Sequence, residues 1–169
     1  MTKLGALTVG KKNQITIMGI LNISPESFYK NSIKSTKSQI IRHVNQLEEN
    51  GADIIDIGGM STAPYLKTIV SEKIETERVS KTIKIIQNCS NLPLSVDTCR
   101  ASVANVALEL GVDVINDISG LKYDNQMPKI IEKYAPSVIL CAYGNNPVVG
   151  NRISITKKLL NESVKIAQK

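Results

Sequence analysis

The stretch Gly51-Ala-Asp-Ile-Ile-Asp-Ile-Gly-Gly-Met-Ser-Thr-Ala-Pro64 decides the fold of this chain. Its isoleucines form a short β-branched run between glycines, which is typical of a strand buried on both faces of a sheet. Asp56 lies inside the run, although an ionised carboxylate is costly to bury without partners. The next two glycines let a ligand approach the backbone closely, and Ser61 and Thr62 then offer hydroxyl groups. Such groups at the carboxyl end of a parallel strand predict a ligand site.

Strands and helices alternate on both sides of this stretch. Apolar runs predict five strands, and apolar residues at helical spacing predict a helix after each strand. Residues 1–14 form a lead-in that a short β-hairpin would suit. The expected strands are residues 15–22, 53–57, 94–97, 112–117 and 137–142, and the final helix is residues 154–168.

Two of the predicted helices carry clear start and stop signals. Ser35 or Thr36 would cap the first helix, and Gly51 stands where a glycine commonly ends a helix. Ser71 would cap the second helix. The apolar faces of these two helices consist of Ile40, Ile41, Val44 and Leu47 in the first and Ile74, Val79, Ile83 and Ile86 in the second.

Residues 49–58 resemble residues 109–118, since Gly51 corresponds to Gly111 and each segment continues into a strand. Strand–helix units repeated at this spacing predict βαβ crossovers and a parallel sheet, either open and doubly wound or closed into a (β/α)₈ barrel. No Gly-x-Gly-x-x-Gly follows the first strand, which counts against dinucleotide binding. Polar residues end strand after strand, and this favours the barrel.

A (β/α)₈ barrel needs eight strands and typically about 250 residues. We therefore expect one α/β domain of the parallel TIM-barrel type over residues 1–169, incomplete at about five of eight units. Either the chain is a fragment, truncated before the last strands, or something else covers the open edge of its sheet.

Composition narrows the classes of partner. The formal net charge is +6, but the lysines are scattered without aromatic residues between them, so we expect no nucleic-acid partner. No apolar run approaches the roughly 20 residues that span a bilayer, so we expect no membrane partner. Three cysteines without a Cys-x-x-Cys pair argue against disulfides or a zinc site and indicate a cytoplasmic protein.

Three polar residues that end predicted strands are candidates for ligand binding. Asn22 could hold Mg²⁺ or a phosphate through its amide, or it could bond its own turn. Asp97 and Asn116 could read the donor and acceptor edge of a flat heterocycle. The alternative for Asp97 is a helix cap, and that for Asn116 is a loop anchor.

The side chains of general-base catalysis are missing. His43 is the only histidine, and we expect it on the surface of the first helix, away from any strand end. No Ser-His or Cys-His pair can therefore form at the predicted site. Cys99 and Cys141 lie near strand ends, where packed thiols are the simpler interpretation.

Four motifs in order resemble the dihydropteroate synthase family of pterin-binding enzymes. They are residues 17–28, 51–64, 94–98 and 114–120. The resemblance implies a (β/α)₈ barrel in which the amine of p-aminobenzoate, or of a related arylamine, displaces pyrophosphate from a pterin-methyl diphosphate. It implies that Asn22 contacts Mg²⁺, that Thr62 lies in the substrate loop and that Asp97 and Asn116 hold the pterin ring. We also place Asp56 and Ser61 of the second motif among the substrate-binding residues.

The chain departs from the family at several positions. Glu26 stands where the family usually has Asp, and Lys30-Asn31-Ser32 stands where it has an Asp-Gly-Gly-like loop. Ala63 replaces an arginine of the second motif, which removes a charge-assisted donor and leaves the acceptor amine open. The segments that would carry the family's sixth to eighth strands are absent from these 169 residues.

Three functions remain open from the sequence. The first is a dihydropteroate synthase-like transferase, here truncated and inactive alone. The second is a pterin-binding methyltransferase domain of the corrinoid type, which would share the ring contacts. The third is an inactive half-barrel that serves another chain. In each case we expect a homo-oligomer or completion by a further polypeptide.

Overall fold

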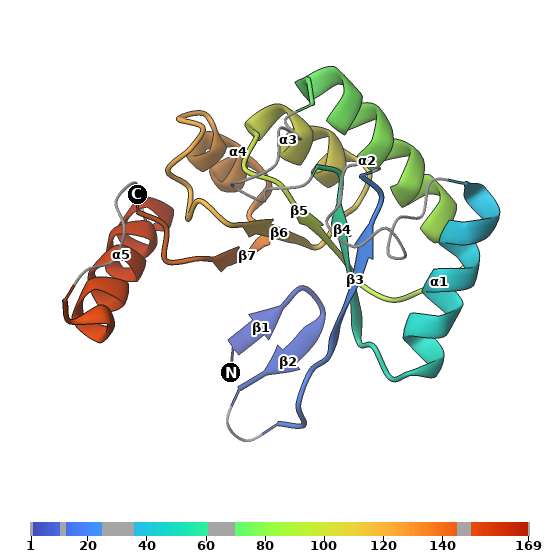
Figure 1. The fold of residues 1–169 in the computed structure, drawn as a ribbon, viewed down its shortest axis with the longest axis horizontal. Coiled ribbons are helices and arrows are strands. Elements are labelled where there is room, and N and C mark those ends of the chain that lie inside the picture. Colours follow the sequence, from blue (N-terminus) through green and yellow to red (C-terminus); the bar gives the residue numbers. More distant parts are fainter. Residues whose placement is uncertain (1, 11–12, 25–35, 61–69, 145–149, 169) are drawn as a thin grey trace.

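Five parallel strands form one sheet, and their order in the sheet follows the chain. The computed structural model describes residues 2–10, 13–24, 36–60, 70–144 and 150–168. The strands, in the order β3-β4-β5-β6-β7, are β3 (Met18–Asn22), β4 (Ile54–Gly58), β5 (Leu94–Asp97), β6 (Val114–Asp117) and β7 (Ser137–Leu140). The predicted N-terminal hairpin is present as the antiparallel pair β1 (Thr2–Leu4) and β2 (Leu7–Val9) (Figure 1).

A helix follows each strand of this sheet; the first four helices cover one face of the sheet, and the last lies beyond β7 (Figure 1). Their shared apolar core includes Leu21, Ile57, Val96 and Ile115 from the strands. Strands in sequential order with helices on one side are typical of a barrel segment, whereas a doubly wound sheet is covered on both faces. The helices are α1 (Lys37–Glu49), α2 (Glu72–Ile86), α3 (Ala101–Glu109), α4 (Met127–Tyr134) and α5 (Arg152–Ala167).

The predicted helix signals are confirmed where the structure describes them. Thr36 caps α1 and forms a reciprocal capping box with Gln39, and Ser71 caps α2 by accepting from the backbone N–H of Ile74. Gly51 and Gly111 follow α1 and α3 with the same left-handed φ of 86°. One detail was wrong: Ile74 is 42% exposed and lies outside the core, because it belongs to the first turn of α2, beside its cap.

The repeated segments link their strands to the preceding strand in the same way. The backbone N–H of Asp53 donates to the carbonyl oxygen of Ile17, and its carboxylate accepts from the Ile17 N–H at 2.8 Å. Asp113, 60 residues later, makes the same two bonds with Leu94, at 3.0 Å each. In both helix–Gly–x–Asp–strand units the aspartate therefore fixes the register with the preceding strand segment through two hydrogen bonds, an arrangement we call the register lock. β3 begins at Met18, three residues after the predicted start at residue 15, because Met18 is the first residue in register with β4 and, among the described residues, β3 has no neighbour on its other side.

Both edges of the sheet are open within the described residues, since β3 and β7 each pair with one strand. Beside the β3 edge, Ile15 is 89% exposed and Ile17 is 49% exposed. Ile20, at 56% exposure, lies in register with Asp56 on the face of the sheet opposite the helices. His43 lies on α1 and is half-buried, with its Nε2 3.2 Å from the carbonyl oxygen of Ile20.

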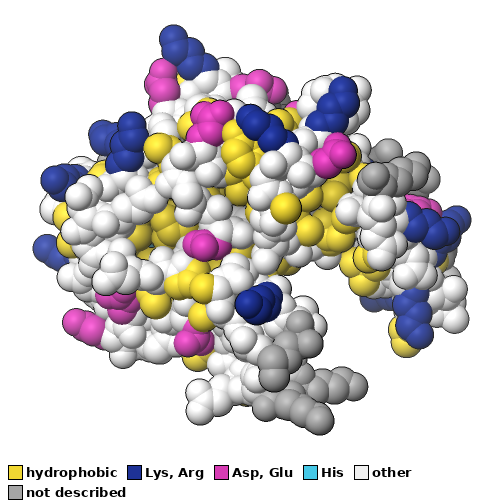
Figure 2. All heavy atoms as spheres, turned by 180° about the vertical axis from the view of Figure 1, so that it is seen from behind, with side chains coloured by type: hydrophobic (Ala, Val, Ile, Leu, Met, Phe, Trp, Pro, Cys, Tyr) yellow, Lys and Arg dark blue, Asp and Glu magenta, His cyan; other side chains and the backbone are white. Residues whose placement is uncertain are grey.

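The opposite view of the molecule shows how its charges are distributed. On this face lysine and arginine side chains are spread around the periphery with acidic side chains between them, and the surface is hollowed between the hairpin and α5 (Figure 2). Within the described ranges, no helix combines the length and the apolar character that crossing a bilayer requires.

Candidate functional site

The two faces of the parallel sheet differ in chemistry because side chains alternate along each strand. One face packs its aliphatic side chains under the helices. On the other face Asn22, Gly58, Asp97 and Asn116 form one row across β3, β4, β5 and β6. Asp56 and Ser95 are register partners in the row below. The carboxyl ends of four strands thus bring polar side chains together on one surface.

Asp56 and Asn116 are directly bonded across this surface. The Asn116 side-chain Nδ2 donates to Asp56 Oδ2 at 3.1 Å. The two residues hold equivalent positions of the sequence repeat, 60 residues apart. This bond uses one hydrogen of the Asn116 amide, so its other hydrogen and its carbonyl oxygen remain for a ligand.

Asp97 occupies the centre of the row and has an unusual titration. Burial, reinforced by the charges of Asp56, Asp117 and Glu75, raises the pKa of Asp97 to about 7. The helix cap that competed with a ligand role is wrong, because the first N–H of α3, on Ala101, donates instead to Asp124 at 2.9 Å. Asp97 therefore remains available to accept from a bound molecule.

Three buried oxygens on this surface lack a hydrogen-bond partner among the described residues: Asp56 Oδ1, Ser95 Oγ and Asp97 Oδ1. Asp56 is 4% exposed and Ser95 is fully buried. Buried polar groups without partners are rare and costly in folded proteins. Their concentration on one side of one sheet indicates a site for a ligand that donates hydrogen bonds.

The exit from β6 is held rigidly beside this site. Both carboxylate oxygens of the fully buried Asp117 accept backbone N–H groups, from Ser119 at 2.7 Å and from Leu121 at 3.0 Å. Gly120 and Leu121 turn the chain through left-handed conformations, with φ of 63° and 65°. Asp117 therefore anchors the loop. The sequence analysis had given this role to the neighbouring Asn116, as the alternative to ligand binding.

Asn22 ends β3 in the same row. Gly58 makes room for it, because a Cβ at that position would lie 2.9 Å from Asn22 Oδ1. The described residues contain no group of three His, Cys, Asp or Glu side chains that could hold a metal. The side-chain amide oxygen of Asn22 is of the kind that Mg²⁺ accepts as a ligand.

Two predicted site residues, Ser61 and Thr62, lie outside the described residues, as does Ala63. The sequence analysis missed Ser95, although its i, i+2 spacing from Asp97 places both side chains on one face of a strand. It also missed Glu75 and Arg100, which are buried and bond to each other beside the exit of β5. No local pattern indicates that either residue is buried. An acidic residue in a first helical turn, such as Glu75, usually faces solvent.

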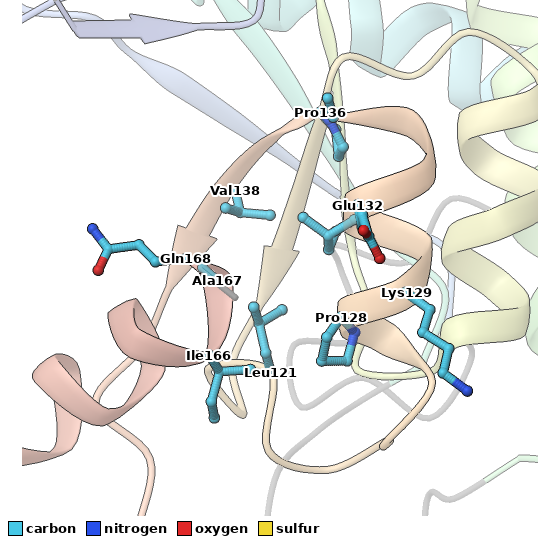
Figure 3. Close-up of a pocket in the computed structure, with 11 residues that line it drawn as sticks. Leu121, Pro128, Lys129, Glu132, Pro136, Val138, Ile166, Ala167 and Gln168 are labelled. Atoms are coloured by element: carbon cyan, nitrogen blue, oxygen red, sulfur yellow. The ribbon is translucent and has the colours of Figure 1, made fainter.

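A separate cavity of about 530 Å³ lies between α4, β7 and the end of α5 (Figure 3). Its lining includes Leu121, Val138 and Ile166. Val138 pairs in register with the core residue Ile115, so this cavity lies on the helix-covered side of the sheet, away from Asp97 and Asn116. The polar surface, not this cavity, is the candidate site.

Comparison with known proteins gives a consistent picture. The profile of the family described as "Pterin binding enzyme" matches residues 18–169. Dihydropteroate synthase of Clostridium beijerinckii is 38% identical over 166 residues, covering 98% of this chain and 61% of that protein.

Solved structures agree with the sequence matches. Dihydropteroate synthase of Clostridium difficile, determined in the presence of pteroic acid, superposes with a TM-score of 0.80 at 34% identity, over 99% of this chain and 61% of that one. Dihydropteroate synthase of Xanthomonas albilineans with 4-aminobenzoic acid superposes with a TM-score of 0.82 at 29% sequence identity, and the match covers 97% of this chain and 60% of that one. The chain thus spans about three fifths of the relatives' length. Its fold is the expected α/β barrel type, incomplete at five strands.

Proposed function

The chain belongs to the family of pterin-binding enzymes, and from this premise we propose that it forms the pterin side of a cytoplasmic dihydropteroate synthase-like site. The reaction would condense a pterin-methyl diphosphate with p-aminobenzoate or a related arylamine and release pyrophosphate. The observation that carries the proposal is the neighbouring pair Asp97 and Asn116, together with buried oxygens of Asp56, Ser95 and Asp97 that have no partner among the described residues. The names of the matched relatives support the synthase over the corrinoid-type methyltransferase.

The described side chains suit one edge of a pterin ring. As a carboxylate, Asp97 accepts from a ring N–H and from the exocyclic amino group. Asn116, fixed by Asp56, offers both an acceptor and a donor to the same edge. This pairing would satisfy Asp97 Oδ1, which has no partner among the described residues.

The main contribution of these residues to the proposed reaction would be to position the pterin. Holding the pterin in one orientation aligns its methylene carbon for the incoming amine. Asn22, with Ser61 and Thr62 at the exit of β4, would contact the diphosphate end. A Mg²⁺ held by Asn22 and the diphosphate would neutralise charge on the leaving group.

Calorimetric titration of pteroic acid into the chain tests the proposal. Replacing Asn116 by alanine should weaken binding about tenfold, because the ring loses one partner and Asp56 loses its donor. Asn88→Ala is the matched control, since Asn88 is exposed and its side chain bonds to the Lys84 carbonyl oxygen in the last turn of α2, outside the site. Absence of binding by the unmodified chain, or equal affinity in both variants, would refute the assignment.

We further propose that the 169-residue chain associates through its open β3 edge, since unpaired strand edges with exposed apolar side chains favour pairing. Light scattering should give a mass above that of one chain. Ile15→Lys, which places a charge beside this edge, should reduce the association, whereas Ile153→Lys on the exposed part of α5 should not. A monomer at all concentrations would show that the edge is protected in some other way.

A further inference from the structure

Glu75 has an acidic side chain in a buried position, at 1% exposure in the first turn of α2. We propose that Glu75 is a positioning residue for Asp97, acting through the loop of residues 98–100 that leaves β5. The proposal rests on the proposed function and deepens it, because it names a residue that sets the geometry of the ring contact without touching the ring.

Both oxygens of the Glu75 carboxylate contact this loop. Oε1 accepts from the Thr98 hydroxyl at 2.7 Å, and Oε2 accepts from Arg100 Nη1 at 2.6 Å. Thr98 is 2% exposed and Arg100 is 6% exposed, so water does not compete strongly for these bonds. The Thr98 hydroxyl also accepts the backbone N–H of Arg100 at 3.2 Å, which closes the loop on itself.

The same loop is fixed on its other side by the strand that carries Asn116. The backbone N–H of Thr98 donates to the carbonyl oxygen of Asn116 at 3.1 Å. Asp97 thus immediately precedes a residue held from two directions, by Glu75 of α2 and by the backbone of Asn116. Releasing the Glu75 side of this arrangement would let Asp97 move relative to Asn116, and the pair could no longer match one ring edge.

The contact of α2 with neighbouring strand exits supports this role. Gly59, directly after β4, lacks a side chain where α2 approaches, because a Cβ there would lie 2.7 Å from Val79 Cγ2 and 3.1 Å from Glu75 Cγ. Arg78, one turn after Glu75, donates to the Gly59 carbonyl oxygen at 3.4 Å. One turn of α2 therefore contacts the exits of both β4 and β5, two strands that contribute to the site.

Thr98→Val is the variant that tests the proposal most directly, because it removes the linking hydroxyl at nearly constant volume and leaves all charges unchanged. Pteroic acid should bind this variant about tenfold more weakly than the unmodified chain. Thr98→Ser, which restores a hydroxyl, should recover most of the affinity. Glu75→Gln should also weaken binding, whereas Glu72→Gln should not, since Glu72 joins α2 to Ser102 of α3 by an exposed bond outside the loop.

A second measurement tests the loop without any ligand. Cys99 lies within it at 8% exposure, and burial is the main reason why its pKa is raised to about 11. In a chain carrying Cys89→Ser and Cys141→Ser, the rate of Cys99 modification by a disulfide reagent reports opening of the loop. Thr98→Val should raise this rate at least several-fold, with Thr98→Ser and Glu72→Gln close to the unmodified chain.

The outcomes separate the two proposals. If the unmodified chain does not bind pteroic acid, the proposed function fails, and the Cys99 rate alone decides whether Glu75 and Thr98 hold the loop. If the chain binds pteroic acid and Thr98→Val leaves both affinity and Cys99 rate unchanged, the positioning role is overturned.

Discussion

Replacing Asp97 by asparagine is expected to weaken binding of pteroic acid by about 10- to 100-fold at pH 7.5, and by much less at pH 5.5. The reason is the pKa of Asp97, which burial and nearby carboxylates raise to about 7. Only the ionised form accepts from two ring donors at once. Affinity of the unmodified chain should therefore rise with pH across this range, and affinity of the variant should stay flat.

Calorimetry at pH 5.5, 6.5 and 7.5 on both proteins measures this effect. Asp113→Asn is the matched control, since it makes the same acid-to-amide change just before β6, at the opposite end of the strand from Asn116. It should leave the pH dependence of binding intact. A pH-independent affinity in the unmodified chain would contradict the role of an ionised Asp97.

The same residue links stability to pH with a definite sign. The folded chain retains a proton on Asp97 up to about pH 7, whereas the unfolded chain releases it near the ordinary value of 3.8. The folded state therefore binds more protons between these values, and the contribution of Asp97 to the free energy of unfolding falls as pH rises through that window. Ionising Asp97 for binding therefore costs the folded state some stability. Asp97→Asn removes this dependence of stability on pH.

Gly120→Ala is expected to lower the free energy of unfolding by roughly 3–5 kcal/mol, the sum of backbone strain and overpacking. Gly120 has a φ of 63°, a conformation that residues with a Cβ adopt only with strain. An added Cβ would lie 2.7 Å from the carbonyl oxygen of Cys141 and would also overlap the Ser163 hydroxyl. The backbone oxygen cannot move aside as a flexible side chain could.

Urea unfolding of the variant should be compared with that of Gly51→Ala. Gly51 has an even larger φ of 86°, but no atom lies within 4 Å of the Cβ that alanine would add, so this control carries the conformational cost of about 1 kcal/mol without the collision. Adding Ser163→Ala to Gly120→Ala should recover only part of the loss. Equal losses at Gly51 and Gly120 would show that the contact with Cys141 is not decisive.

Local patterns were enough to predict the sheet and its helices. The five strands, the caps Thr36 and Ser71 and the ends of α1 and α3 at glycine each depend on a few neighbouring residues, so a single sequence reveals them. The polar row was also predictable, because Asp97 and Asn116 end parallel strands that lie next to each other.

Features that depend on packing between distant residues were not predicted. The bonds of Glu75 to Thr98 and Arg100 span 23 and 25 residues, and nothing in the first turn of α2 indicates that this acid is buried. Ile74 was assigned to the core from its spacing, but its place beside the helix cap leaves it exposed. Residues 15–17 have strand composition, yet β3 begins at Met18, the first residue in register with β4.

The paired bonds made by Asp53 and Asp113 have a consequence for synthesis on the ribosome. Each aspartate bonds to a residue that is synthesised before it, Asp53 to Ile17 and Asp113 to Leu94. Both pairs of bonds can therefore form without any later segment of the chain. Every strand of the sheet also pairs with the strand that emerges directly before or after it. Nascent chain emerges at about 5–20 residues per second, far more slowly than helices and loops form. The sheet can therefore grow one strand at a time from the N-terminus, with its register set before the next unit leaves the exit tunnel.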